Sequence, residues 1–464
     1  MNKNILKNEY LLNFLMKFHW LFDQLGVDRA ISITLITRFL NVIAGLGLIY
    51  FVSHYLSLEM QGYYYTFYSL IALQVFAELG LNYAVIQFAS HEMVALEWNE
   101  NGHLIGDENA KKRLHSLLKF SFNWFGTAGL ALVFLLGPFG IYFFSKTASP
   151  EILFQTQLAW VLLLIFTALI FFVNAGLALI EGCNKVIDVA IIRFIQVLIS
   201  TVTICYALAT NMQLYSLAIG SAASFFVGCV LLFSKFRKLL VDLWRYDEPL
   251  KGMNWKEEIW PFQWRIGVSW ISGYLVFQIF NPILFASRGP VEAGKMGMSL
   301  QIISAINGLF IVWLTTKAPI FGQLIAKKDR RSLDDLFNRS LMQSLAALIF
   351  SILLLLFCIY YLSINSPIYL SRVIPLNYWM ILSVACISNH ILFSEAVYLR
   401  AHKEEPLIWL SIWNGLTTLV LALVLIPTLG TLGAVLSFSI SAIIFGLFGG
   451  TIIFLTKRNS YYFR

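Results

Sequence analysis

The sequence predicts an all-α, polytopic membrane protein with 12 transmembrane helices in two six-helix lobes. Three observations lead to this class. Of the 464 residues, 59% are hydrophobic and only 12% are charged, which no soluble domain of this length matches. Twelve apolar stretches are long enough to cross a bilayer. The basic residues between these stretches fall almost entirely on alternate connections, and therefore on one side of the membrane.

The predicted spans follow one another with short connections. They lie near 31–56, 62–90, 114–144, 152–180, 187–210, 213–234, 259–286, 293–325, 338–362, 374–399, 406–427 and 430–456. Several exceed the roughly 20 residues that a crossing requires, so we expect tilted or extended helices. Pro138, Pro282 and Pro319 fall inside spans and should kink them.

The distribution of Lys and Arg fixes the orientation and the division into halves. With a cytoplasmic N-terminus, the outside connections hold only Lys146, Arg288, Lys295 and Arg372. The sequence thus predicts an N-lobe over 30–235, a basic cytoplasmic linker over 236–258, a C-lobe over 259–457 and a cytoplasmic tail over 458–464. Residues 1–29 read as an amphipathic cytoplasmic segment, because their apolar part is too short to span. The basic pI of about 9.1 is a topology signal, and no nucleic-acid partner is expected.

The two halves share a weakly repeated sequence pattern. Because six spans precede the linker, both halves enter the membrane from the same side, as in transporters with parallel repeats. Arg38 and Arg265 lie about two turns into the first span of each half. Each of these spans is followed by a short outside turn with an acid and a glycine, Glu59 to Gly62 and Glu292 to Gly294.

The first span carries a cation within an apolar helix. Thr34, Arg38, Asn41 and Gly45 recur at helical spacing, so one stripe of this helix is polar or small. A charge in a membrane helix costs roughly 3 kcal/mol on insertion scales. We therefore expect the stripe to line a central cavity in which Arg38 meets an anion.

Three further cations are embedded near the cytoplasmic ends of spans: Arg193, Arg265 and Lys317. Together with Arg38 they could receive a phosphate or diphosphate headgroup, because the planar guanidinium binds two oxygens at once. The alternative is that these long side chains only reach the aqueous surface without any ligand.

The embedded titratable groups are candidates for ion coupling or charge pairing. Glu78 lies near the middle of the second span, and Arg38 is its expected partner, with a coupling proton as the alternative. Glu395 and His390 lie in the tenth span. Pairing or solvation is the simpler role for Glu395, and one imidazole alone is a weak indication of a proton site.

No catalytic pattern is present. The chain has no Gly-rich phosphate loop and no metal-spaced cluster of His and Cys, and its five cysteines are scattered among the spans. The sequence therefore predicts neither an enzyme, a cofactor nor a metal site. The tyrosine-rich run Tyr63 to Tyr68 is more typical of the interfacial aromatic belt than of a sugar platform.

A local motif now points to a family. The turn after the first span has the form L-x-x-E-x-x-G-x-Y from Leu56 to Tyr64, and the second span holds Glu78-Leu79-Gly80-Leu81. In these features, and in its length and two-half organisation, the chain resembles the Wzx-like oligosaccharide flippases. They are the polysaccharide transporter branch of the multidrug/oligosaccharidyl-lipid/polysaccharide (MOP) exporter superfamily.

This resemblance implies a two-lobed, MATE-like transporter of the bacterial inner membrane. Its substrate would be an undecaprenyl-diphosphate-linked oligosaccharide, such as an O-antigen repeat unit of lipopolysaccharide, moved by alternating access coupled to an ion gradient. Membrane lipids, a polysaccharide polymerase and a chain-length regulator are the partners it implies. The sugars, the coupling ion and the oligomeric state stay open.

Other functions remain alternatives. A MATE-type multidrug exporter of organic cations would be opposed by Arg38, which repels a cationic drug. A polysaccharide polymerase or ligase would need a larger outside loop than the segment from Ser363 to Val373. A sugar-nucleotide or major-facilitator carrier would show a compact Gly/Asp/Arg signature, which the loop from Glu92 to Lys119 lacks.

Overall fold

The computed structural model describes residues 43–100, 102–245, 254–365, 370–402 and 404–462. Within these ranges, ten helices are long and apolar enough to cross a membrane, and a bent helix pair makes an eleventh span. The shorter apolar helix Ile43–Tyr55 is the described part of the predicted first span. The chain is thus a multi-pass membrane protein. The segment 1–29 and Arg38 lie outside the described residues.

The spans agree with the predicted ones to within a few residues at most ends. The first half holds α3 (Leu58–Ile71), α4 (Gln74–Glu78), α5 (Leu81–Glu92), α6 (Glu108–Ser145), α7 (Pro150–Gly182), α8 (Val186–Ala209) and α9 (Tyr215–Arg245). The second half holds the π-helical turn η2 (Trp255–Ile259), α10 (Trp260–Phe277), α11 (Phe280–Arg288), α12 (Pro290–Thr315), α13 (Ala318–Ala326), α14 (Arg330–Asn365), α16 (Leu376–Ala401), α17 (Ile408–Leu429), α18 (Thr431–Ser441), the π-helix η3 (Ala442–Gly450) and α19 (Thr451–Tyr462).

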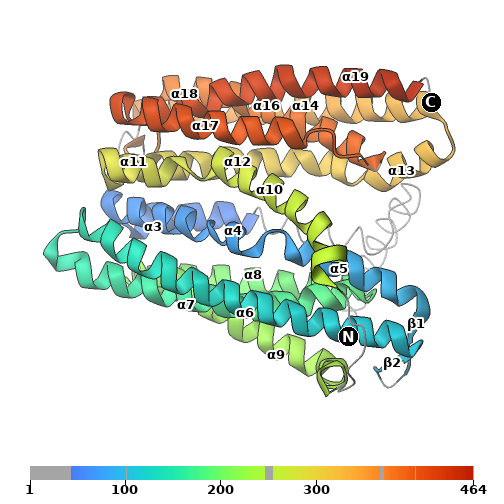
Figure 1. Cartoon of the computed structure of the whole chain (residues 1–464). Coiled ribbons are helices and arrows are strands. Elements are labelled where there is room, and N and C mark those ends of the chain that lie inside the picture. Colours follow the sequence, from blue (N-terminus) through green and yellow to red (C-terminus); the bar gives the residue numbers. More distant parts are fainter. Residues whose placement is uncertain (1–42, 101, 246–253, 366–369, 403, 463–464) are drawn as a thin grey trace, which may run out of the picture.

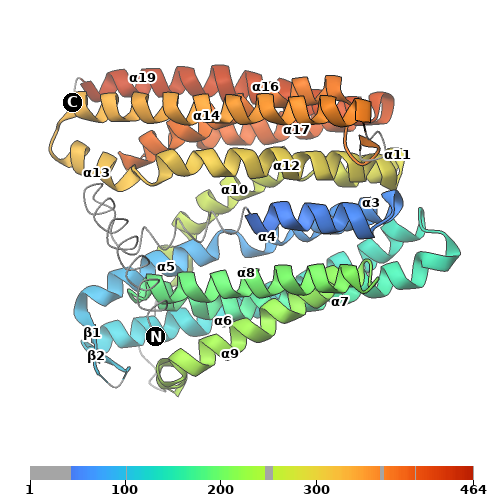
Figure 2. The same cartoon turned by 180° about the vertical axis from the view of Figure 1, so that it is seen from behind.

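The helices gather in two bundles that lie side by side (Figures 1 and 2). We call α5 to α9 the N-terminal bundle and α11 to α19 the C-terminal bundle, and α3 and α10 run between them. The connections at 92–108, 182–186, 326–330 and 401–408 share one end, at the right of Figure 1, which we call the basic end. We call the other end of the molecule the opposite end.

Two of the three prolines coincide with helix breaks, and the lost backbone hydrogen bond explains the position of each break. A proline removes the hydrogen bond to the carbonyl four residues earlier. Four residues before Pro282 is Gln278, where α10 gives way to α11, and four before Pro319 is Thr315, where α12 ends. The helix α6 continues through Pro138. A further break at Leu79 and Gly80, both in the left-handed region, bends the second span by 43°.

A short hairpin at the basic end was not expected. Strands β1 (Leu96–Trp98) and β2 (Leu104–Gly106) pair antiparallel between α5 and α6. The indole N–H of Trp98 donates to the carbonyl of Cys183, at 2.8 Å, and Lys185 lies 4.7 Å from the centre of the Trp98 ring. The hairpin is thereby fixed to the turn between α7 and α8.

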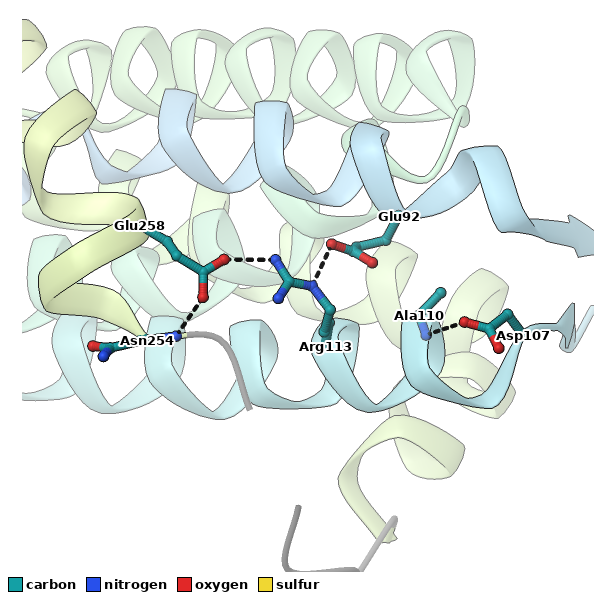
Figure 3. A network of polar contacts seen from close by, with 6 residues as sticks. All are labelled: Glu92, Asp107, Ala110, Arg113, Asn254 and Glu258. Atoms are coloured by element: carbon teal, nitrogen blue, oxygen red, sulfur yellow. Dashed lines mark hydrogen bonds and ion pairs between the residues drawn. The ribbon is translucent and has the colours of Figure 1, made fainter. Parts of the chain in front are cut away.

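A charge network at the basic end ties the start of α10 to the N-terminal bundle (Figure 3). Arg113 of α6 donates to Glu92 of α5 and to Glu258 of η2, each at 2.7 Å. Glu258 also accepts from the backbone N–H of Asn254, at 2.9 Å. Beside this network, the Trp255 ring stacks on Phe120 at 5.7 Å. Hydrogen bonds from the Asn254 backbone and from Arg113 lower the pKa of Glu258.

We predict that Glu258→Gln lowers stability by about 1 kcal/mol or less, since the pair is partly exposed. Because the folded-state pKa of Glu258 is lowered, its contribution is present above the ordinary carboxyl pKa of about 4.3 and is lost as the pH falls through the lowered value. Thermal unfolding of the purified protein should show a wild-type advantage at neutral pH that disappears in strong acid. The exposed neighbour Glu257 provides the control Glu257→Gln, and an equal effect of both variants would contradict the assignment.

Candidate functional site

The two halves of the chain come very close together at the opposite end, where the backbones of α3 and α12 touch. A methyl group built on Gly62 would lie 1.9 Å from the carbonyl oxygen of Pro290, and one on Gly294 would lie 2.8 Å from the Gly62 nitrogen. A methyl group on Gly297 would lie 2.5 Å from Cβ of Tyr65. Only glycine permits this approach, so the three glycines are required for the contact.

Polar side chains along α3 complete this contact. Gln61, Tyr65 and Ser69 recur every fourth residue and therefore share one face of the helix. We call them, with their partners Gln278, Asn281 and Gln301, the amide seam. Gln61 Nε2 donates to the carbonyl of Gly294 at 3.0 Å, Tyr65 donates to Gln301 at 2.6 Å, Asn281 donates to Ser69 at 2.9 Å, and Ser69 donates to Gln278 at 3.3 Å.

The outer edge of the seam carries one charge. Arg372 donates to Gln61 Oε1 at 3.1 Å, and its carbonyl accepts from Gln61 Nε2 at 2.9 Å. Behind the seam, Phe285 of α11 inserts between aromatic rings of the other half. Its ring centre lies 4.9 Å from that of Tyr63 and 5.6 Å from that of Phe144. The opposite end is therefore closed by polar and aromatic contacts together.

Near the middle of the second span, the break at Leu79 and Gly80 packs on α10. A methyl group on Gly267 would lie 3.1 Å from the carbonyl oxygen of Leu79, and Ile266 lies against Gly80. The ring of Phe76 meets that of Tyr274 edge-on at 5.6 Å. The second span thus contacts the second half of the chain along its length, from the opposite end of the molecule to the bend at Leu79 and Gly80.

Of the embedded cations, Arg193 and Lys317 have partners within their own bundles. Arg193 Nη1 lies 2.9 Å from Glu181 Oε2, and its side chain remains 44% exposed. Lys317 lies at the break between α12 and α13, and its ammonium donates to Ser340 of α14 at 2.8 Å. Within the described part of the chain, neither of these two cations is bonded to a residue of the amide seam.

Arg265 differs from both. It lies on the first turns of α10, in the helix that runs between the bundles, and its side chain is exposed. Its guanidinium carbon lies 5.8 Å from the centre of the Trp264 ring. Among the described residues, no carboxylate lies within ion-pair distance of Arg265. Arg265 is thus the embedded cation of α10 that the described carboxylates leave without an ion pair.

The carboxyl of Glu78 lies where the second span breaks. Asn82, one turn on, donates to it, and Arg193 lies within electrostatic range. Its expected pairing with Arg38 involves a residue outside the described ranges.

His390 is fully buried, and both of its ring nitrogens have partners. Nδ1 lies 2.8 Å from Asn307 Oδ1, and Nε2 lies 3.0 Å from Ser344 Oγ. The imidazole thereby connects α16 to α12 and α14, and this structural role accounts for its position.

Glu395 is buried beside the irregular part of the last span. Its side chain is 3% exposed, and Oε2 has no hydrogen-bond partner among the described residues. Thr451 is the neighbouring side chain that can hydrogen-bond to this carboxyl, and Asn389 Nδ2 is buried and unpartnered in the described part of the chain. Gly450, at the end of the π-helix η3, lies next to the Glu395 carboxyl. Such π-helical turns are frequent at functional sites.

Sequence reasoning missed the amide seam and the π-helix. The spacing of Gln61, Tyr65 and Ser69 was a usable signal, since it places three polar groups on one face of an apolar helix. Nothing in the apolar run from Ala442 to Gly450, apart from its three glycines, distinguishes a π-helix from an α-helix.

No protein-family model and no curated protein matches the sequence. Solved structures match it over most of its length. The lipid II flippase MurJ in an inward closed conformation aligns with a TM-score of 0.66 and 16% identity, covering 91% of this chain and 86% of that chain. An inward-facing multidrug resistance MATE family transporter aligns with a TM-score of 0.68 and 14% identity, covering 93% and 100%.

A third match is a MOP superfamily transporter from Pyrococcus furiosus Vc1, described by the reverse polarity of its binding pocket. It aligns with a TM-score of 0.58 and 14% identity, covering 90% of this chain and 95% of that chain. These neighbours are transporters and flippases. At such low identity the likeness concerns the fold alone, and the chain shares the overall helical fold of these structures.

Proposed function

We propose that this protein is a flippase of the bacterial inner membrane. It moves an undecaprenyl-diphosphate-linked oligosaccharide, such as a polysaccharide repeat unit, from the inner to the outer leaflet. The N-lobe (30–235) and the C-lobe (259–457) rock against each other in alternating access. The basic end faces the cytoplasm, because Lys and Arg concentrate on that side.

The observation that carries this proposal is the cation on α10. Arg265 is exposed, has no described carboxylate partner and lies in the helix between the bundles. A diphosphate entering from the cytoplasm would meet its guanidinium, which can bind two oxygens at once. Arg38 would supply the matching cation from the first half. Arg193 and Lys317 would add positive potential from their own bundles.

A multidrug exporter is the second candidate, since MATE transporters share the fold. Arg265 disfavours it, because this cation on the helix between the bundles has no carboxylate partner among the described residues and the substrate of such a pump is a cation. The Pyrococcus transporter, with a binding pocket described as of reverse polarity, is a neighbour of the same fold. The polymerase alternative would need outside loops, and the segment between α14 and α16 is short.

In the proposed cycle, a closed opposite end belongs to an inward-facing state. The inward-facing MATE family structure aligns with a TM-score of 0.68 and an outward-facing one with 0.61, which supports this part of the proposal. Ligand binding drives the change of state only if the ligand favours one state over the other. A diphosphate that bridges Arg38 and Arg265 would do so by drawing the two lobes together at the basic end.

Ion coupling would use Glu395. A buried carboxylate is costly when it is charged and unpartnered, so the group takes up a proton or a cation. Glu395 lies in the second half, beside the π-helix of the last span, and can respond to helix movement there. Glu78 is the second candidate, and His390 the third.

We predict that Arg265→Ala reduces translocation of the lipid-linked oligosaccharide by at least about tenfold, since a charge-assisted contact is worth roughly 1.5–3 kcal/mol. Arg38→Ala should behave in the same way, and Arg265→Lys should recover only part of the activity. The assay is translocation in proteoliposomes or restoration of surface polysaccharide in a deficient strain. Arg237→Ala, at an exposed position of α9, is the matched control. Full activity of Arg265→Ala at normal expression would refute the assigned role.

We predict that Gly62→Ala prevents closure of the opposite end, because the added methyl group would overlap the Pro290 carbonyl at 1.9 Å. Translocation should fall to background. The distance between spin labels at Glu59 and Val291, in a cysteine-free background, should lengthen. Gly308→Ala is the control on α12, since nothing lies within 4 Å of its added methyl group. A wild-type distance distribution in Gly62→Ala would rule out this gate.

We predict that Glu395→Gln abolishes the dependence of transport on the ion gradient and leaves substrate binding intact, because the amide cannot exchange a proton or neutralise a cation. Transport in proteoliposomes is measured with imposed proton and sodium gradients. Glu151→Gln, at the exposed start of α7, is the control. If Glu395→Gln still responds to the gradient as the wild type does, the coupling group lies elsewhere.

A further inference from the structure

The amide seam has an unusual composition for a contact between membrane helices. Its six side chains, Gln61, Tyr65, Ser69, Gln278, Asn281 and Gln301, are all polar and all uncharged. They extend from the opposite end inward over two turns of α3, or about 12 Å at 1.5 Å per residue. The only charged side chain bonded to them in the described chain is Arg372, at the outer edge.

Closing the opposite end does not by itself require polar side chains. Replacing both partners of a buried hydrogen bond with apolar groups of the same shape is close to neutral, so leucines could seal the same interface. The polar groups matter when the bundles part. Each amide then loses its partner and needs a donor and an acceptor from whatever occupies the passage.

One seam group already lacks a partner. Asn281 is 6% exposed, its Nδ2 donates to Ser69, and its Oδ1 has no partner among the described residues. An acceptor held unpaired at the seam awaits a hydroxyl or amide donor. Neutral hydroxyl groups suit the seam best, because each hydroxyl both donates and accepts, whereas a phosphate only accepts.

The distance between seam and cation sets the size of the ligand. Gln278 and Arg265 lie on the same helix, and their separation of thirteen residues corresponds to about 20 Å along α10. A diphosphate held at Arg265 would need a chain of several sugars to reach the seam. A single sugar would not reach it.

We propose that the amide seam is the sugar-recognition surface of the transporter. It opens to bind the neutral hydroxyls of an oligosaccharide headgroup as that headgroup passes to the outside. This inference rests on the proposed flippase function. The seam thus has two states: polar groups paired between the two halves of the chain when it is closed, and polar groups paired with sugar hydroxyls when it is open.

The test compares two ligands on one protein. Full-length protein in nanodiscs, in the wild-type and Gly62→Ala backgrounds, is titrated with undecaprenyl-diphosphate-linked oligosaccharide and with undecaprenyl diphosphate that carries no sugar. Gln278→Leu combined with Gln301→Leu should weaken binding of the sugar-bearing lipid by about tenfold and leave the sugar-free lipid unchanged. The effect should be larger with Gly62→Ala, where the seam stays open.

Gln155→Leu is the matched control, because Gln155 makes an amide pair with Gln213 at 3.2 Å, outside the seam. Tyr65→Phe, which removes one hydroxyl, replaces the double variant if that protein does not fold, with an expected loss of about threefold. An equal loss for both lipids, or no loss for either, would overturn the seam proposal alone. Failure of the wild-type protein to bind either lipid would overturn the proposed function together with it.

Discussion

The contact between the backbones of α3 and α12 is the constraint on which the arrangement depends. Three glycines permit it, and any side chain at Gly62 would collide with the Pro290 carbonyl. With the helices this close, Gln61 and Tyr65 reach partners in the other half without crossing a gap. Hydrocarbon offers no hydrogen-bond partners, so polar side chains at this depth require a partner from the protein or from water. The contact therefore fits the closed state of the passage that we propose.

The embedded charges follow the same logic. Arg193 lies against Glu181, and Lys317 donates to Ser340, so each is satisfied within its bundle. Arg265 has no such partner among the described residues, and it lies on the helix that runs between the bundles. Glu395 is the corresponding carboxyl in the C-terminal bundle. It is buried, and one of its oxygens has no hydrogen-bond partner within the described ranges. An anionic ligand at Arg265 and a coupling cation at Glu395 would thus bind at separate places in the same half of the protein.

Hydropathy and the alternation of basic residues predicted the span positions well, because length and apolarity are the properties that a bilayer selects. Proline positions predicted two breaks, each four residues upstream of the ring. The bend at Leu79 and Gly80 was not predicted, and Gly267, which packs against it, belongs to a helix far along the chain. The partners of Gln61 and the surroundings of Glu395 could not be predicted either, because a single sequence does not tell which helices of a bundle are neighbours.

The glycine contact also bears on the origin of the chain. Gly62 is the fifth residue of α3 and Gly294 the fifth residue of α12, and these helices hold corresponding places in the two halves. Such a joint is what a six-span ancestor would form by pairing with its own copy across a twofold axis, with one glycine facing itself. Fusion of two copies would free each side to diverge. The asymmetry at this joint, where the Gln61 side chain donates to the backbone carbonyl of Gly294, would then mark a difference between the two halves.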